Sequence, residues 1–116
     1  MLGKRFNKIV GDSGEAIAIN YLKKHKYKII ETNYKHKIGE IDVIAKKNNV
    51  LIFVEVKYRS SDYFGLPREA VNEYKQNKIR LIATAYIKQK RLFDNPCRFD
   101  VIEILDGKIT HIEDCF

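Results

Sequence analysis

The stretch that decides the fold runs from Gly39 to Lys57 and reads GEIDVIAKKNNVLIFVEVK. Its two ends, residues 39–45 and 50–57, are rich in β-branched and aromatic residues, and the polar segment KKNN separates them. This pattern is typical of two strands joined by a tight turn. The stretch therefore predicts a β-hairpin.

The hairpin places charged residues together. A two-residue turn at positions 48 and 49 would put Asp42 directly opposite Glu55 and Glu40 opposite Lys57. Side chains alternate along a strand, so all four would share one face. Opposite residues come within about 5 Å at Cβ, close enough for the two carboxylates to bind one divalent cation.

A less specific interpretation treats these residues as solvated charges on an exposed sheet face. Residues 51–54, LIFV, are apolar on both faces, however, which is typical of a central strand covered on both sides. Charges at the end of such a strand are costly to desolvate, and proteins usually keep them at functional sites. We therefore favour a functional site built on Asp42 and Glu55.

The rest of the chain predicts helices around this hairpin. A first helix from Asp12 to residues 24–26 would present Ile17, Ala18, Tyr21 and Leu22 on one face, and residues 27–34 would form a strand. A second helix would end near residue 90, and the strands 98–105 and 108–113 would follow it. We expect its buried stripe to comprise Ala70, Val71, Tyr74, Ile79, Ile82, Ala83 and Tyr86.

This element order predicts an α/β fold. The second helix is a crossover between strands 50–57 and 98–105, so these strands should be parallel, while the hairpins are antiparallel. The result is an αβββαβ core with a mixed central sheet flanked by helices. A chain of 116 residues has room for one domain, and we expect residues 1–11 to form a flexible basic arm.

Charge and composition favour a polyanionic partner. The 22 Lys and Arg against 15 Asp and Glu give a net charge of +7, which points first to nucleic acid. No apolar stretch approaches a membrane span, and the basic start leads into polar sequence, so we expect a cytoplasmic protein with no membrane association. The cysteines, Cys97 and Cys115, are expected to be reduced, and a zinc site has almost no support.

The motifs resemble a known family. GEID at 39–42 followed by FVEVKYR at 53–59 resembles the D…ExK signature of the restriction-endonuclease-like PD-(D/E)xK superfamily. GExxAxxYL at 14–22, EAV at 69–71 with KQ at 75–76, and RFDV at 98–101 extend the resemblance over nearly the whole chain, to the YraN-like family of small proteins. One departure is Tyr58, where such families carry Thr.

The resemblance implies a metal-dependent nuclease. Asp42 and Glu55 would hold Mg²⁺ or Mn²⁺, and Lys57 would stabilise phosphate charge or help to deprotonate and orient the attacking water. Glu15 would be a further metal ligand, although a carboxylate in the first turn of a helix needs no such reason. Gln76 would lie beside the site, or be an ordinary polar helix residue. Glu40 would support the metal or pair with Lys57.

Nucleic acid would need further contacts. Basic residues near the expected mouth of the site are candidates for phosphate contacts, although lysine-rich surfaces are commonly only solvated: Lys37, Arg59, Arg68, Lys75 and Lys78. Tyr34, Tyr58 and Tyr63 are candidates for stacking on unpaired bases, with ordinary packing as the alternative.

Three classes of function remain open. The first is an endonuclease acting on DNA, on branched, flapped or single-stranded structures in repair or recombination. The second is a non-catalytic nucleic-acid-binding subunit of a DNA-processing complex. The third is a structural protein with a buried ion network. The sequence leaves the oligomeric state open, including a homodimer or a complex with DNA-repair proteins.

Overall fold

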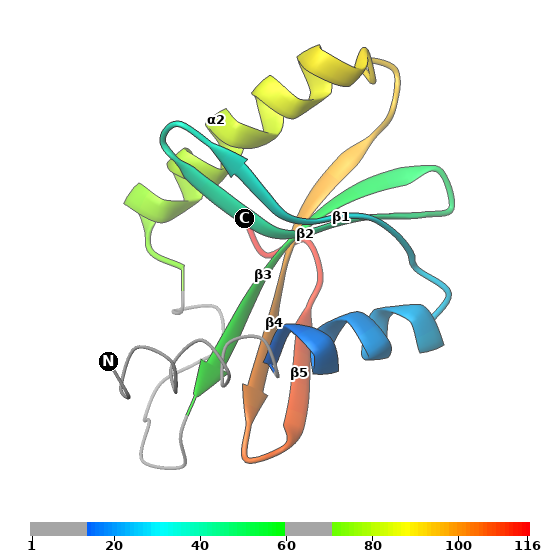
Figure 1. Cartoon of the computed structure of the whole chain (residues 1–116), viewed down its shortest axis with the longest axis vertical. Coiled ribbons are helices and arrows are strands. Elements are labelled where there is room, and N and C mark those ends of the chain that lie inside the picture. The colour runs from blue at the N-terminus through cyan, green and yellow to red at the C-terminus, as the bar shows by residue number, and fades with distance from the viewer. Residues whose placement is uncertain (1–13, 60–70) are drawn as a thin grey trace.

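A computed structural model describes residues 14–59 and 71–116. Residues 14–24 are helical, and the elements that follow are β1 (Lys28–His36), β2 (Gly39–Lys47), β3 (Val50–Arg59), α2 (Glu73–Lys90), β4 (Cys97–Leu105) and β5 (Lys108–Ile112). The sheet order is β1-β2-β3-β4-β5, as Figure 1 shows. The β3–β4 pair is parallel and the other pairs are antiparallel. The expected α/β fold with a mixed sheet is confirmed.

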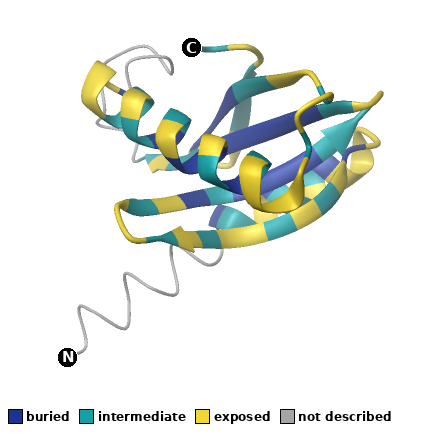
Figure 2. Cartoon of the chain, turned by 90° about the horizontal axis from the view of Figure 1, so that it is seen from above, coloured by how far each residue is buried: buried dark blue, intermediate teal, exposed yellow. Residues whose placement is uncertain are grey.

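The two described helices cover opposite faces of the sheet (Figures 1 and 2). The α2 face contains a core cluster in which Ile82 and Tyr86 join Ile44 and Phe53 of the hairpin. The other face contains a cluster in which Ala18 and Leu22 join alternate residues of β2, β3 and β4. The central strand β3 is therefore buried on both faces, as its apolar LIFV segment predicts.

The hairpin turn has the predicted form. Asn48 and Asn49 have φ of 51° and 65°, the left-handed values that a two-residue turn of type I′ requires. The paired residues of β2 and β3 follow the predicted register from Lys47 opposite Val50 to Val43 opposite Val54. The site residues of this hairpin lie just beyond the last of these pairs.

The second helix ends near residue 90, as expected, but it begins later than expected. It starts after the N-cap Asn72, whose side chain accepts a hydrogen bond from the Lys75 amide, so Val71 precedes the helix. Arg91 closes the helix with a left-handed cap. Tyr74, placed on the buried stripe by its spacing, is 74% exposed, and Ile17 of the first helix is 37% exposed.

Other expectations concern residues outside the described ranges. Asp12, the basic arm of residues 1–11, Tyr63, Arg68 and Ala70 all lie there. Both cysteines lie within the described ranges and form no disulfide. Within those ranges, no helix combines the length and apolar character needed to cross a bilayer.

Candidate active site

Asp42 occupies the point where β2 and β3 separate. Its Oδ2 accepts a hydrogen bond of 2.8 Å from the backbone amide of Val56. If the pairing of β2 and β3 continued in the same register, the Val56 amide would donate to a main-chain carbonyl of β2. The Asp42 carboxylate takes the place of that carbonyl as the acceptor. This bond holds Asp42 against the strand segment that carries Glu55 and Lys57.

Glu55 lies at the centre of a cluster of charged side chains. It is 6% exposed, and its Oε1 lies 2.6 Å from Lys75 Nζ and 3.4 Å from Lys57 Nζ. Lys57 comes from the same face of β3, while Lys75 reaches down from the first turn of α2. Lys75 was expected only as a peripheral phosphate contact, but it is in fact the shortest ionic contact of Glu55.

The pKa of Asp42 is raised from 3.8 to about 7. Burial is the largest cause, followed by the negative charge of Glu55, and the Val56 hydrogen bond opposes both. Near neutral pH the repulsion between the two carboxylates is relieved when Asp42 keeps its proton, and a bound cation would relieve it in the same way. This electrostatic conflict is the main chemical signal of the site.

The two lysines differ in their electrostatics. Burial lowers the pKa of Lys57, and the neighbouring positive charge of Lys75 lowers it further. Burial also acts to lower the pKa of Lys75, but the short contact with Glu55 outweighs it, so that pKa is raised. Lys57 is therefore the amine of this pair that loses its proton more readily.

A pocket of about 440 Å³ opens over the carboxylate pair. Asp42, Glu55 and Glu40 line it from β2 and β3, and Lys75 and Lys78 line it from α2. A larger pocket of about 540 Å³ lies at the carboxyl end of α2, with Glu31 as its one acidic lining residue. The smaller pocket is the candidate active site because it contains the paired carboxylates.

The two supporting candidates, Glu40 and Gln76, occupy different positions. Glu40 lines the pocket; its register partner on β1 is Lys35, and the register partner of Lys57 on β4 is Glu103. The predicted pairing of Glu40 with Lys57 across β2 and β3 is wrong, because the paired region of these two strands ends before it reaches them. Gln76 donates a 2.9 Å hydrogen bond to the Val71 carbonyl at the start of α2 and does not line the pocket.

Glu15 lies near the pair without lining the pocket. Its charge contributes to the raised pKa of Asp42, and its Oε2 accepts a 2.9 Å hydrogen bond from Asn33 Nδ2. Gly14 brings the helix this close, because a Cβ at this position would lie 3.0 Å from Tyr58 Cδ2. The geometry leaves Glu15 as a neighbour that adds negative charge to the site.

The remaining basic candidates occupy different positions. Arg59 Nε lies 2.7 Å from Glu103 Oε2, so its charge is neutralised within the sheet. Lys37 is exposed in the β1–β2 turn, and Lys78 lines the pocket beside Lys75. Two lysines of α2 and Lys57 thus surround the carboxylates.

The donor set fits a hard divalent cation. Asp42 and Glu55 offer carboxylate oxygens, the ligands that Mg²⁺ and Mn²⁺ prefer. No cluster of three or more potential metal-binding side chains occurs within residues 14–59 and 71–116. Mg²⁺ commonly uses only one or two carboxylates and completes its shell with water and substrate phosphates, so a pair is sufficient.

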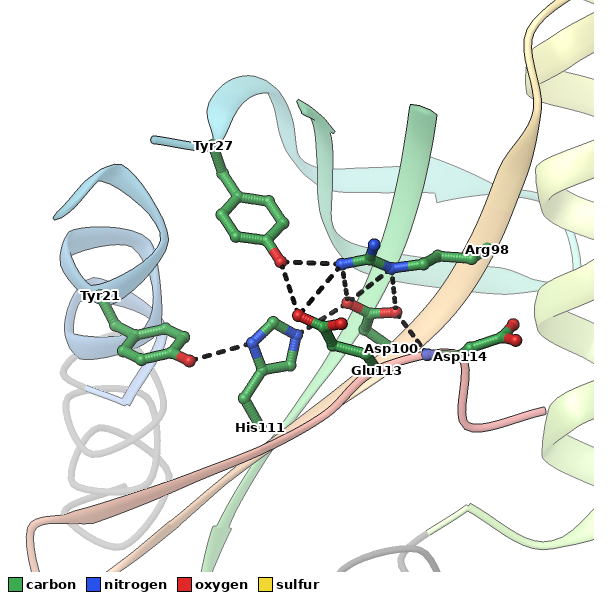
Figure 3. Close-up of polar contacts among 7 residues, drawn as sticks. All are labelled: Tyr21, Tyr27, Arg98, Asp100, His111, Glu113 and Asp114. Atoms are coloured by element: carbon green, nitrogen blue, oxygen red, sulfur yellow. Dashed lines mark hydrogen bonds and ion pairs between the residues drawn. The ribbon is translucent and has the colours of Figure 1, made fainter. Parts of the chain in front are cut away.

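The sequence did not predict a second polar cluster, on the opposite face of the sheet (Figure 3). Asp100 is fully buried and accepts hydrogen bonds from Arg98, the Asp114 amide and the ring of His111, the last at 2.7 Å. Tyr21 contacts the other ring nitrogen of His111, and Arg98 donates to the Tyr27 hydroxyl. Alternation places Arg98 and Asp100 on one face, but the contacts with His111 and the tyrosines depend on the tertiary fold.

Asp42→Asn tests the electrostatic conflict directly. The folded state keeps the Asp42 proton up to about pH 7, whereas the unfolded chain releases it near 3.8, so stability falls as pH rises through this window. Asparagine keeps an acceptor for Val56 but carries no charge. We expect the metal-free variant to be more stable than wild type by roughly 2 kcal/mol at pH 8.

The measurement is urea unfolding at pH 8 and at pH 4.5, in EDTA. The advantage of the variant should shrink at the lower pH, because folded wild type is then protonated at Asp42. A variant less stable than wild type at pH 8, or a gap equal at both values, would contradict the raised pKa.

Comparison with known proteins gives a family but no activity. Residues 14–104 match the family described as "Uncharacterised protein family UPF0102". A UPF0102 protein of Clostridium beijerinckii is 47% identical over 119 residues, covering 97% of each chain. One of Clostridioides difficile is 50% identical over 112 residues (95% of this chain and 98% of the relative), and one of Thermodesulfovibrio yellowstonii is 48% identical over 107 residues (92% and 95%).

Proposed function

Because the chain belongs to the UPF0102 family, whose name assigns no activity, we propose a function from its own site: a metal-dependent phosphodiesterase that cleaves nucleic acid, DNA in the first place. The observation that carries this proposal is the pair Asp42 and Glu55, a half-buried and a buried carboxylate that repel each other, with lysines around them. Buried like charges of this kind are unfavourable in a structural role and useful at a catalytic one.

The two carboxylates and the three lysines near them each have a task in this proposal. Asp42 and Glu55 would hold Mg²⁺ or Mn²⁺, and the chemistry that such an ion would supply is Lewis-acid polarisation of the scissile phosphate and a lower pKa for the attacking water. Lys57 either stabilises the charge that develops on the phosphate or orients and deprotonates the water, for which its lowered pKa suits it. Lys75 and Lys78 bind the phosphate backbone.

Lys75 has a second task while no cation is bound. Its ammonium group supplies the positive charge nearest to Glu55, at 2.6 Å, and so keeps the buried carboxylate paired. If Asp42 and Glu55 held a divalent cation, Glu55 would no longer need Lys75 as its partner, and Lys75 would be able to bind a phosphate. The same lysine would thus couple metal binding to substrate binding.

The arrangement is similar to that of the PD-(D/E)xK nucleases, and we propose that the chain is one of them. The aspartate lies just beyond the last β2–β3 pair, and the glutamate and lysine lie two residues apart on the adjacent strand. The net charge of +7 supports a nucleic-acid substrate. We expect the protein to work in the cytoplasm, alone or with DNA-repair proteins.

A non-catalytic nucleic-acid-binding subunit is the second candidate. The basic charge supports it equally well. It leaves the carboxylate pair unexplained, because binding a phosphate backbone gains nothing from two acidic groups in the lining of the pocket. The two candidates therefore differ over cleavage and not over binding.

A panel of labelled substrates tests the proposal. Single strands, duplexes, flaps and branched junctions of DNA, with matching RNAs, are incubated with the protein and Mg²⁺ or Mn²⁺. We expect metal-dependent cleavage of at least one DNA structure, reduced at least about 100-fold by Glu55→Gln, which keeps the shape of the side chain but loses its charge.

Three outcomes are informative. Equal cleavage by wild type and Glu55→Gln would show that another site, or a contaminant, cuts the substrate. Tight binding without cleavage of any substrate would favour the non-catalytic subunit. Neither binding nor cleavage would remove both candidates.

A further inference from the structure

A second, smaller pocket adjoins the candidate active site. Its volume is about 260 Å³, and Ile38, Tyr74, Asn77, Lys78 and Leu81 line it. Tyr74 and Lys78 also line the carboxylate pocket, so the two hollows are adjacent.

The wall of this second pocket is apolar and exposed. Tyr74 is 74% exposed, Leu81 62% and Ile38 39%. Only seven large apolar side chains are exposed in the described part of the chain, and three of them meet here. Single exposed apolar residues are ordinary, but a cluster of them beside charged groups marks a binding site.

The helix presents these residues outward by its own geometry. Tyr74, Lys78 and Leu81 follow one another at spacings of four and three residues and therefore share a face of α2. The neighbouring face carries Ile79 and Ile82 into the core. The exposure of Tyr74 is thus a property of a well-packed helix.

We propose that this pocket binds the base of an unpaired nucleotide next to the phosphate in the carboxylate pocket. The inference rests on the proposed function for the position of that phosphate. It names the substrate class: single strands, or structures with unpaired bases beside the cut.

The chemistry of the pocket favours a base over other occupants. Its volume is below the range of pockets for drug-sized ligands, so it suits one flat ring system. Tyr74 offers an aromatic ring on which a base stacks, and Lys78 Nζ, 5.5 Å from that ring's centre, provides a positive charge for the adjoining phosphate. A base inside a duplex is stacked on both sides and cannot present its face to Tyr74.

Of the tyrosines that the sequence suggested for base stacking, the two within the described residues do not line this pocket. Tyr34 packs edge-on against Tyr86 and donates a hydrogen bond to Gln89, and Tyr58 packs against Gly14. Tyr74, which was expected in the core, is the aromatic residue that lines both pockets. It is therefore the residue to test.

Binding without cleavage tests the inference separately from the proposed function. A labelled single strand of thymidylates and a blunt duplex of equal length are titrated with protein in EDTA at low salt. Tyr74→Ala should weaken single-strand binding about tenfold and leave duplex binding within twofold, while Tyr74→Phe keeps the wild-type affinity. Phe93→Ala is the matched control, because Phe93 is 66% exposed beyond the far end of α2.

The absence of tryptophan from the chain allows a second readout. Tyr74→Trp introduces a single tryptophan whose fluorescence should be quenched by the single strand and not by the duplex. Phe93→Trp should show no such quenching. This measurement reports stacking even if the change in affinity is small.

Several results would overturn the inference. They are undetectable binding of wild type to the single strand, equal losses of Tyr74→Ala on both DNAs, or an unquenched Tyr74→Trp. Self-association of wild type that Tyr74→Ala abolishes, without an effect on DNA, would show that a second copy of the chain covers the pocket. Metal-dependent cleavage, together with unchanged single-strand binding by Tyr74→Ala, would contradict this inference and leave the proposed function intact. Selective single-strand binding without cleavage would contradict the proposed function and leave this inference intact.

Discussion

Replacing Lys57 with alanine is expected to slow single-turnover DNA cleavage about 10²- to 10³-fold and to leave DNA affinity within about twofold. The reason is that its proposed partner is charge that develops on the phosphate only in the transition state. A group of this kind contributes to the chemical step without contributing much to ground-state binding. Cleavage at saturating protein separates the two effects.

The structure indicates that this variant will fold. Deleting one member of a buried ion pair can cost about 3–5 kcal/mol when the other charge is left alone. Glu55 keeps Lys75 at 2.6 Å after Lys57 is removed, so it remains paired. Circular dichroism and a melting curve should therefore be close to those of wild type.

Lys78→Ala is the comparison for this experiment. Lys78 lines the pocket but makes no ion pair with Glu55, so its loss should weaken binding and spare the chemical step at saturation. Lys75 is unsuitable for this role because of its contact with Glu55. If Lys57→Ala cuts as fast as wild type, the catalytic role of Lys57 is wrong.

Replacing Asp100 with alanine is expected to destabilise the protein by about 3–5 kcal/mol. Its carboxylate is fully buried and accepts hydrogen bonds from Arg98, His111 and the Asp114 amide, all of which would lose their acceptor. The affected residues lie on β4, on β5 and in the segment after β5. Urea unfolding at pH 7 measures the loss.

A matched control lies in the same cluster. Glu113 also approaches Arg98, at 3.6 Å, but its side chain is 61% exposed. Exposed ion pairs contribute little, so Glu113→Ala should cost less than about 1 kcal/mol. An Asp100→Ala variant as stable as Glu113→Ala would contradict the structural role assigned to the cluster.

The same cluster predicts a pH dependence. Burial acts to raise the pKa of Asp100, but hydrogen bonds from His111, Arg98 and the Asp114 amide outweigh it, and the pKa is lowered. The stabilisation from ionised Asp100 is therefore present above the unfolded pKa and is lost as pH falls through the lower, folded value. The ionisation of Asp42 changes stability with pH in the opposite sense. A double variant that removes both Asp42 and Asp100 would therefore show neither of the two effects.

The sequence predicted the fold well where local patterns decide it. The polar segment KKNN and the apolar strands on either side specify the hairpin and its register, and the helix between β3 and β4 specifies a parallel pair. The position of Asp42 beside the Glu55 strand follows from the same register. These features depend on residues that are close in the chain.

The features that the sequence did not predict depend on distant parts of the chain. Lys75 reaches Glu55 from another element, and His111 reaches Asp100 across the β4–β5 hairpin. Tyr74 was expected on the buried stripe of α2, but it lies on the face of Lys78 and Leu81, beside the pocket and away from the core.

Metal binding by Asp42 and Glu55 is the central claim, because every proposed role in cleavage depends on it. Calorimetric titration with Mn²⁺ at pH 8 tests it directly, on wild type and on the double variant Asp42→Asn, Glu55→Gln. The amides keep the size of both side chains and remove both charges. We expect weak binding of Mn²⁺ by wild type and no detectable binding by the double variant; identical isotherms would contradict the claim.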